Sequence, residues 1–164
     1  MHRTRTGIAV AAAVVLGWTR AASAEGSARP GACSLLPAAE VKKLAAPDDA
    51  FFDRFPPPDE EPLGPNGSAC SYSSIHVQLN PFTPERLEAL RKERGAAWTA
   101  VAGVGDAAYF HDNDRSEFAR TGELYARSGG NVVTIQIDLD EGESAESALV
   151  AATALAKALI AKLR

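Results

Sequence analysis

The sequence has few of the residues that build reactive sites. Its 164 residues include only two cysteines, one methionine and three histidines. No Cys-x-x-Cys spacing occurs and no histidine adjoins a cysteine, which disfavours a zinc or thiol redox centre. A Gly-x-Ser-x-Gly nucleophile motif is also missing. Residues Gly103–Ala108 fit Gly-x-Gly-x-x-Ala, but a strand rather than a helix is predicted after them, so no dinucleotide or other cofactor is expected.

Long apolar runs are confined to the start of the chain. His2, Arg3 and Arg5 form a basic segment, residues 7–18 are largely apolar, and residues 22–24 read Ala-Ser-Ala. This order is typical of a bacterial export signal cleaved near Ala24, and the apolar run is too short to span a bilayer. We expect residues 1–24 to be this signal and the mature protein to be periplasmic or secreted. The alternative is an uncleaved N-terminal anchor.

An excess of positive charge is also missing. The chain has 17 Lys and Arg against 21 Asp and Glu. Loss of Arg3, Arg5 and Arg20 with the signal would leave 14 basic against 21 acidic residues, a net charge of −7. Such an excess of negative charge opposes non-specific nucleic-acid binding and attraction to anionic lipid surfaces. No nucleic-acid partner is therefore expected, and no membrane span is expected in the mature chain.

The two cysteines, Cys33 and Cys70, both lie in the predicted exported part. In an oxidising compartment an isolated pair most simply forms one disulfide. On the chain-entropy model, closing a loop of this length stabilises the fold by about 4 kcal/mol. Cys33 follows Arg-Pro-Gly-Ala rather than the apolar residues of a lipoprotein signal, so a lipid-modified N-terminus is not expected.

The strongest structural signal is the segment Gly122–Asp138, where two β-rich runs flank Gly129-Gly130. A Gly-Gly pair suits the two-residue loop of a β-hairpin. If Ser128 and Asn131 close the loop, one register puts the large aliphatic side chains on one face and most polar groups on the other. The predicted cross-strand pairs are Ala126–Val133, Leu124–Ile135, Gly122–Ile137, Tyr125–Thr134 and Glu123–Gln136.

Other periodic patterns place the remaining elements. Residues 25–32 are expected to be a disordered lead and residues 33–164 a single domain. The predicted elements are a helix opening near Pro37, a strand from Cys70 to Leu79, a helix capped by Thr83, a strand over Ala107–Phe110 and a helix from Ala145 to Leu163. The alternative for Cys70–Leu79 is a strand that breaks near Ser73-Ser74. Residues 47–68, with six prolines, predict a long irregular loop. This order predicts an α+β domain with an antiparallel sheet of about four strands and helices packed on one face.

The densest polar cluster is His111-Asp112-Asn113-Asp114, predicted to lie in a loop after a strand. Its alternating oxygen donors are candidates for weak binding of a divalent cation, and His111 is a candidate general base. The other interpretation is a solvated turn. His76 lies on the predicted solvent side of its strand and would meet His111 only if their two strands were neighbours.

Aromatic side chains form the other candidate site. Phe51, Phe52 and Phe55 lie in the proline-rich loop, and Trp98 and Tyr109 lie further along the chain. They would line an apolar pocket or a partner surface, or else fill the core and hold the loop against it. Both interpretations stay open at this point.

Three sequence patterns resemble a class of uncharacterised exported bacterial proteins, many of them small actinobacterial lipoproteins. They are Cys-x-Leu-Leu-x-x-x-Glu-Val from Cys33, Ala-Cys-x-Tyr from Ala69, and Val-x-Gly-Val-Gly-Asp-Ala-Ala from Val101. The resemblance covers most of residues 33–163 and implies a Cys33–Cys70 disulfide and a fold with helices on a sheet. It carries no catalytic residues, and this chain lacks the lipoprotein signal.

The sequence therefore favours a non-enzymatic exported domain that binds an envelope protein or an apolar small ligand. The alternative is a hydrolase or metal-dependent enzyme that uses His76, His111 and Asp112 or Asp114. The distance between the two histidines distinguishes the two-histidine site from the binding domain.

Overall fold

The computed structural model describes residues 30–45, 60–113, 120–140 and 143–164. The described elements, in chain order, are α1 (Ala32–Leu35), α2 (Ala38–Ala45), β1 (Glu60–Pro62), β2 (Ser68–Tyr72), β3 (Ile75–Leu79), α3 (Pro84–Arg94), the 3-10 turn η2 (Gly95–Ala97), β4 (Thr99–Ala100), β5 (Ala107–Asn113), β6 (Arg120–Ser128), β7 (Asn131–Leu139) and α4 (Ala145–Lys162). The predicted export signal lies outside the described residues. Among those described, no helix is long and apolar enough to cross a membrane.

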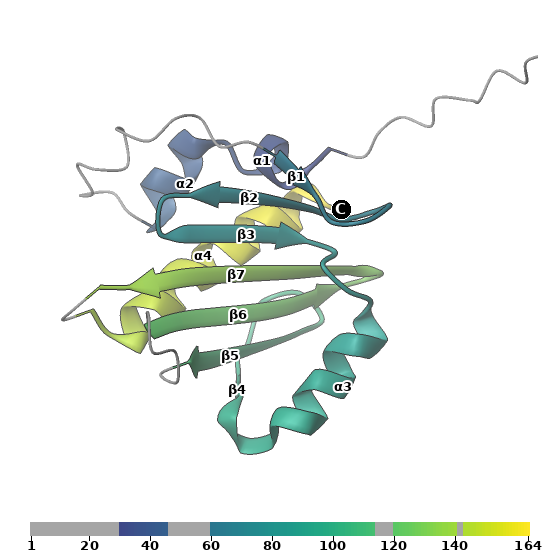
Figure 1. Ribbon diagram of the computed structural model, residues 1–164, viewed down its shortest axis with the longest axis vertical. Coiled ribbons are helices and arrows are strands. Elements are labelled where there is room, and N and C mark those ends of the chain that lie inside the picture. Colours follow the sequence, from purple (N-terminus) through teal and green to yellow (C-terminus); the bar gives the residue numbers. More distant parts are fainter. Residues whose placement is uncertain (1–29, 46–59, 114–119, 141–142) are drawn as a thin grey trace, which may run out of the picture.

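The strands form one antiparallel sheet in the order β1-β2-β3-β7-β6-β5-β4 (Figure 1). The predicted α+β class and antiparallel sheet are confirmed, but the number of strands is wrong, because seven described strands form the sheet rather than about four. Two differences account for part of the excess. The strand expected over Cys70–Leu79 breaks near Ser73-Ser74, the alternative given by the sequence, and forms a hairpin of β2 and β3 that turns at Ser73 with φ of 54°. Residues 60–62, expected in a loop, form the edge strand β1.

The β6–β7 hairpin has the predicted register at every pair. Ser128 faces Asn131 across the Gly-Gly loop, Leu124 faces Ile135, and Tyr125 faces Thr134. Gly129 has φ of 57°, a conformation that glycine adopts without a steric penalty. Burial of Leu124 and Ile135 fixes this register, since a slip by one residue would move both side chains to the other face.

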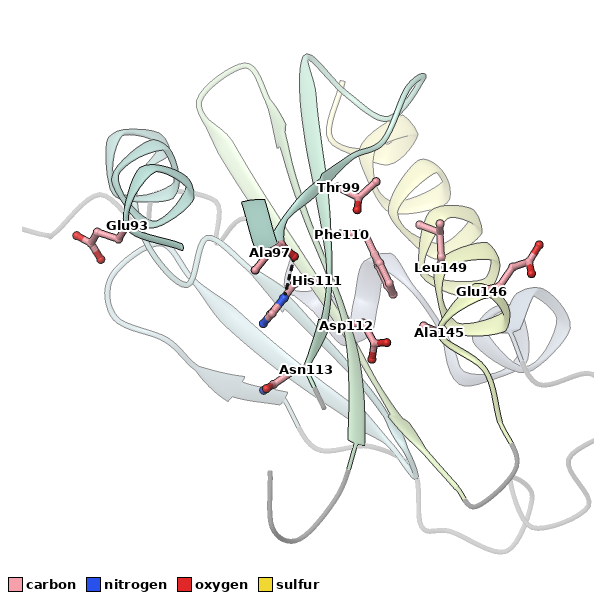
Figure 2. A pocket seen from close by; sticks show the side chains of 10 residues that line it. All are labelled: Glu93, Ala97, Thr99, Phe110, His111, Asp112, Asn113, Ala145, Glu146 and Leu149. Atoms are coloured by element: carbon pink, nitrogen blue, oxygen red, sulfur yellow. Dashed lines mark hydrogen bonds between the residues drawn. The ribbon is translucent and has the colours of Figure 1, made fainter. Parts of the chain in front are cut away.

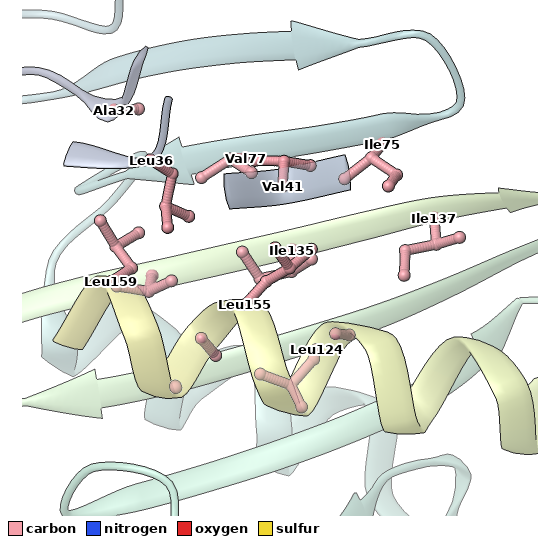
Figure 3. Close-up of a cluster of buried hydrophobic side chains, with 14 of the residues drawn as sticks. Ala32, Leu36, Val41, Ile75, Val77, Leu124, Ile135, Ile137, Leu155 and Leu159 are labelled. Carbon is pink, nitrogen blue, oxygen red and sulfur yellow. The ribbon is translucent and has the colours of Figure 1, made fainter. Parts of the chain in front are cut away.

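One face of the sheet holds the main core (Figure 3). Helix α4 crosses this face over β6 and β7, and α1 and α2 pack beside it. The side chains of Leu155 and Leu159 from α4 meet Ile135 from β7, and all three are fully buried. Ser144 caps α4 because its Oγ accepts the Ser147 N–H at 3.1 Å, as the sequence predicts.

Helix α3 lies on the opposite face, so the expectation that the helices pack on one face is wrong for α3. Thr83 Oγ1 caps this helix by accepting the Arg86 N–H at 3.4 Å. Leu87 of α3 is fully buried in a second cluster with Trp98, Tyr125 and Val132. Because side chains alternate along a strand, Tyr125 and Val132 point away from the main core.

Two predicted boundaries also shift. Ala32, expected in the lead of residues 25–32, begins α1 and is fully buried. Strand β5 continues to Asn113, although residues 111–113 are expected in a loop. The second shift decides the geometry of the candidate site, because strand residues point alternately to the two faces of the sheet.

Candidate functional site

A cleft of about 1010 Å³ lies at the β5 edge of the sheet (Figure 2). One half opens between β5 and the start of α4. It is lined by Thr99, Phe110, Asp112, Ala145, Glu146 and Leu149. Phe110 and Leu149 supply an apolar wall, while two carboxylates lie at the rim. This half is suited to an aliphatic group of a ligand that carries a positive charge near the carboxylates of the rim.

The other half of the cleft opens on the opposite face of the same strand. It is lined by Glu93, Ala97, His111 and Asn113. Figure 2 shows His111 and Asn113 pointing away from α4, whereas Phe110 and Asp112 point toward it. The cleft therefore surrounds the edge of β5 and presents side chains from both faces of the sheet.

The backbone of β5 is open along part of this edge. Strand β4 pairs with β5 only at Tyr109 and Phe110, and the Val101 N–H extends the pairing by donating to the Ala108 carbonyl at 2.9 Å. Alternate residues of a strand direct their backbone groups to the same edge. The N–H and C=O of Asp112 therefore point in the same direction as those of Ala108, and Asp112 lies beyond the last residue that pairs with β4.

Charged contacts hold the rim of the cleft in place. The Arg120 guanidinium binds the Asp112 carboxylate with two hydrogen bonds, and its Nε lies 3.0 Å from Asp112 Oδ1. Arg86 pairs with Glu93 at 3.0 Å. Glu146 forms no ion pair with a described residue. The cleft thus carries Asp112 on one half and Glu93 on the other, each paired with an arginine, and the charge of Glu146 is not compensated by any residue in the described ranges.

The predicted cation site is not assembled by the residues described. His111 and Asp112 point to opposite faces of β5, and Arg120 already occupies the Asp112 carboxylate. The His111 ring instead donates through Nδ1 to the Ala97 carbonyl at 3.1 Å. No group of three His, Cys, Asp or Glu side chains comes together within the described ranges. Asp114 lies outside them.

The two histidines of the alternative enzyme are also apart. His76 is on β3 and His111 is on β5, with β7 and β6 between them. Three strand spacings separate them by about 14 Å, which is too far for one metal ion or one proton transfer. The two-histidine site is therefore wrong.

His76 belongs instead to a hydrogen-bonded row on the open face of the sheet. Its Nδ1 lies 3.0 Å from Ser71 Oγ, and its Nε2 lies 3.3 Å from Asp138 Oδ2. Gln136 Nε2 donates to the other Asp138 oxygen at 3.0 Å. A hydroxyl, an imidazole and a carboxylate in sequence are the components of nucleophilic acyl transfer. The hairpin turn at Ser73-Ser74 was the one sequence signal that would pair Ser71 with His76.

The predicted aromatic surface divides into two parts. Trp98 is 8% exposed, and its ring stacks on Tyr125 with centroids 4.6 Å apart. Tyr109 packs at the margin of this cluster, where the Arg91 guanidinium lies 5.4 Å from its ring centroid. Trp98 therefore fills a second core, one of the two interpretations of the sequence. Phe51, Phe52 and Phe55 lie outside the described residues.

Comparisons with known proteins add no relative to this geometry. No family model matches the chain, and neither the curated proteins nor the solved structures contain a match. The resemblance to exported bacterial proteins stays a prediction, and the geometry of the site is what bears on function.

Proposed function

We propose that this chain is an exported, non-enzymatic binding domain whose ligand occupies the cleft around the edge of β5. The observation that carries the proposal is a cleft of about 1010 Å³ that opens on both faces of one strand. Binding sites are usually concave, with apolar walls and a few placed polar groups. Here Phe110 and Leu149 form the wall, while Glu146 and the Asp112–Arg120 pair lie at the rim.

The proposed location is the periplasm or the outside of the cell. The basic start, the short apolar run and the Ala-Ser-Ala site support export. The disulfide between Cys33 and Cys70 is consistent with an oxidising compartment, where such bonds persist. The ligand would accordingly be a component that the cell envelope or its surroundings supply.

A display library of random peptides and protein fragments tests the cleft without assuming a ligand. Binders are selected on the wild-type protein and then measured on Leu149→Arg, which places a long charged side chain in the apolar half. We expect the affinity of the dominant binders to fall by about tenfold or more, because one lost apolar contact removes roughly 1.4 kcal/mol or more.

Val150→Arg is the matched control, because Val150 is the next residue of α4 and is 66% exposed. It adds the same charge to the same helix outside the cleft and should leave binding unchanged. Circular dichroism and the thermal midpoint establish that both variants are folded. Binders that tolerate Leu149→Arg as well as Val150→Arg would place the site elsewhere and refute the proposal.

The Ser71–His76–Asp138 row supports a second candidate function, acyl transfer. In it, Ser71 Oγ attacks an ester carbonyl and its proton passes to His76 Nδ1. The leaving alcohol takes that proton from His76. Water then attacks the acyl group on Ser71 and gives a proton to His76, which returns it to Ser71 Oγ as the acid is released. Asp138 would hold the imidazole in the tautomer that leaves Nδ1 free to accept. The row lies on an open sheet face, so only small activated esters would fit it without further binding energy.

A fluorophosphonate reagent or p-nitrophenyl acetate tests this second candidate. Mass spectrometry should find the adduct on Ser71, and the His76→Gln and Asp138→Asn variants should each slow its formation. Ser74→Ala is the control, because it removes a neighbouring hydroxyl of the same hairpin. A labelling rate that is unchanged in Ser71→Ala would exclude acyl transfer at this row.

A further inference from the structure

We infer that the ligand of the β5 cleft is an extended, basic segment of a partner protein, which adds to the sheet as a strand beside β5. This inference rests on the proposed function and specifies the class of partner. Three features of the described residues carry it. They are the direction of the free backbone groups, the two-sided shape of the cleft and the distribution of charge.

The backbone N–H and C=O of Asp112 can form hydrogen bonds with an added strand. A bulge opposite Arg127, where the Asp106 N–H donates to the Arg127 carbonyl at 2.7 Å, sets the phase of β5. From Ala107 onward, odd-numbered residues therefore direct their backbone groups to β6 and even-numbered residues to β4. Since β4 ends its pairing at Phe110, the groups of Asp112 reach the cleft. A peptide strand there would exchange two hydrogen bonds with Asp112.

The shape of the cleft matches the alternation of side chains in a strand. An added strand sends successive side chains to opposite faces of the sheet. One would enter the half beside Phe110 and Leu149, and its two neighbours would enter the half beside His111 and Asn113. A compact small molecule would fill only one half. A cleft that surrounds a strand edge is therefore better suited to an extended chain.

The opposite edge of the sheet is formed by a strand whose residues prevent further strand pairing. Strand β1 is exposed throughout and consists of Glu60, Glu61 and Pro62. Charged residues and proline at an edge strand prevent further pairing, because proline has no N–H and like charges repel. At the β5 edge Arg120 neutralises Asp112, so no such barrier remains. The two edges thus differ in the property that strand addition requires.

The acidic side chains at the cleft favour a partner segment with positive charge. Glu146, which has no ion pair with a described residue, lies at the rim of one half of the cleft, and Glu93, which pairs with Arg86, lies in the other half. The whole chain carries a net charge of −4. An acidic segment would be repelled, whereas lysine or arginine beside an aliphatic residue would be attracted. The expected sequence pattern is an aliphatic residue with a basic residue on each side.

The probe is an acetylated, amidated heptapeptide, Lys-Val-Lys-Ile-Lys-Val-Lys, titrated onto the full chain and compared with its glutamate counterpart. We expect the lysine peptide to bind and the glutamate peptide to bind at least about tenfold more weakly. Glu146→Lys should reduce the affinity of the lysine peptide severalfold. Equal affinity for the two peptides, or no binding of either, would overturn the inference of a basic partner.

Backbone methylation tests strand addition itself. Methyl groups are placed on the amides of one edge of the extended peptide, residues 2, 4 and 6, or of the other edge, residues 3 and 5. Only the set that faces β5 should abolish binding, since a strand uses one edge for its ladder. Hydrogen exchange at the Asp112 amide should slow in the complex, while exchange at Gly130 stays the same.

The outcomes separate this inference from the proposed function. If Leu149→Arg abolishes binding but the two methylated peptides behave alike, the cleft is the site and strand addition is refuted. If Leu149→Arg binds the peptide as well as wild type does, the proposed function fails together with the inference. A dimer that forms without peptide and is broken by Leu149→Arg would assign the edge to a second copy and refute a separate partner.

Discussion

Cys33, the second residue of α1, is bonded to Cys70, the middle residue of β2, with their Cα atoms 5.2 Å apart. Beside this bond the Ala32 N–H donates to Ser68 Oγ at 2.8 Å. The two contacts attach the first helix to a strand near the edge of the sheet. Leu36, the C-cap residue of α1, and Val41 of α2 are both fully buried in the main core. The disulfide therefore keeps a part of the core in place that reaches the sheet by few other contacts.

Replacing both cysteines by serine should lower the free energy of unfolding by about 4 kcal/mol, because the bond restricts the unfolded chain across 37 residues. Urea unfolding of wild type and of the double variant measures the difference. Addition of reductant should lower the midpoint of the wild type to that of the variant and leave the variant unchanged. Coincident unfolding curves for oxidised and reduced wild type would contradict this role.

The local parts of the fold were predictable because their signals lie within a few residues of each other. The hairpin register follows from Gly129-Gly130 and the alternation of Leu124 with Tyr125. The N-terminal caps of α3 and α4 follow from the hydroxyls of Thr83 and Ser144. The side of the sheet that a helix covers is decided by distant partners. Leu87 of α3 meets Trp98 and Val132 on the second face, and no short-range pattern indicates that choice.

The candidate site was predictable only as a set of residues. His76, His111 and Asp112 stand out in the sequence as polar groups able to take part in catalysis or metal binding, yet their grouping depends on strand order. With β7 and β6 inserted between β3 and β5, His76 meets Ser71 and Asp138 instead of His111. The position of the cleft along β5 depends on where β4 stops pairing with it. The composition of residues 99–113 does not indicate that point.

Gly122 should tolerate no side chain, because a Cβ there would lie 2.6 Å from the Cβ of Ala148 and 3.0 Å from the Phe110 ring. Gly122→Ala should lower the free energy of unfolding by about 1–3 kcal/mol, since the α4 backbone or the ring has to move. Gly130→Ala is the control, with open space at its Cβ position, and should change it by less than about 0.5 kcal/mol. Equal stability of the two variants would mean that α4 does not pack closely on β6.

Tyr72 should make the protein less stable in alkaline solution. Its hydroxyl donates to the Leu36 carbonyl, and burial, followed by the nearby Glu60 and Glu40 carboxylates, raises the pKa of Tyr72 above its ordinary value of 10.0. Above pH 10 the unfolded chain loses this proton while the folded chain retains it. Stability is therefore fully present below pH 10 and falls as the pH rises beyond it.

Tyr72→Phe provides the comparison for this pH effect. At pH 7 the variant should be less stable by about 1 kcal/mol, the usual net value of one lost hydrogen bond. Between pH 10 and 11 its stability should fall less steeply than that of wild type, because it lacks the Tyr72 proton that only the unfolded chain loses in this range. The measurement is urea unfolding across this range of pH. Parallel curves for the two proteins would show that Tyr72 ionises as readily when folded as when unfolded.

Thr134 gives the opposite kind of prediction, a substitution that stabilises. The residue is 6% exposed on β7, and its hydroxyl has no hydrogen-bond partner among the described residues. A buried hydroxyl without a partner loses its bonds to water and gains none in return. Thr134→Val keeps the branched shape that suits a strand and should raise the free energy of unfolding by up to about 1 kcal/mol.

Thr99→Val, at an exposed position of β4, is the control and should change the free energy of unfolding by less than about 0.5 kcal/mol. A loss of stability in Thr134→Val measured by urea unfolding would mean that the hydroxyl is bonded in solution, and the open sheet face would then hold an ordered partner at that position.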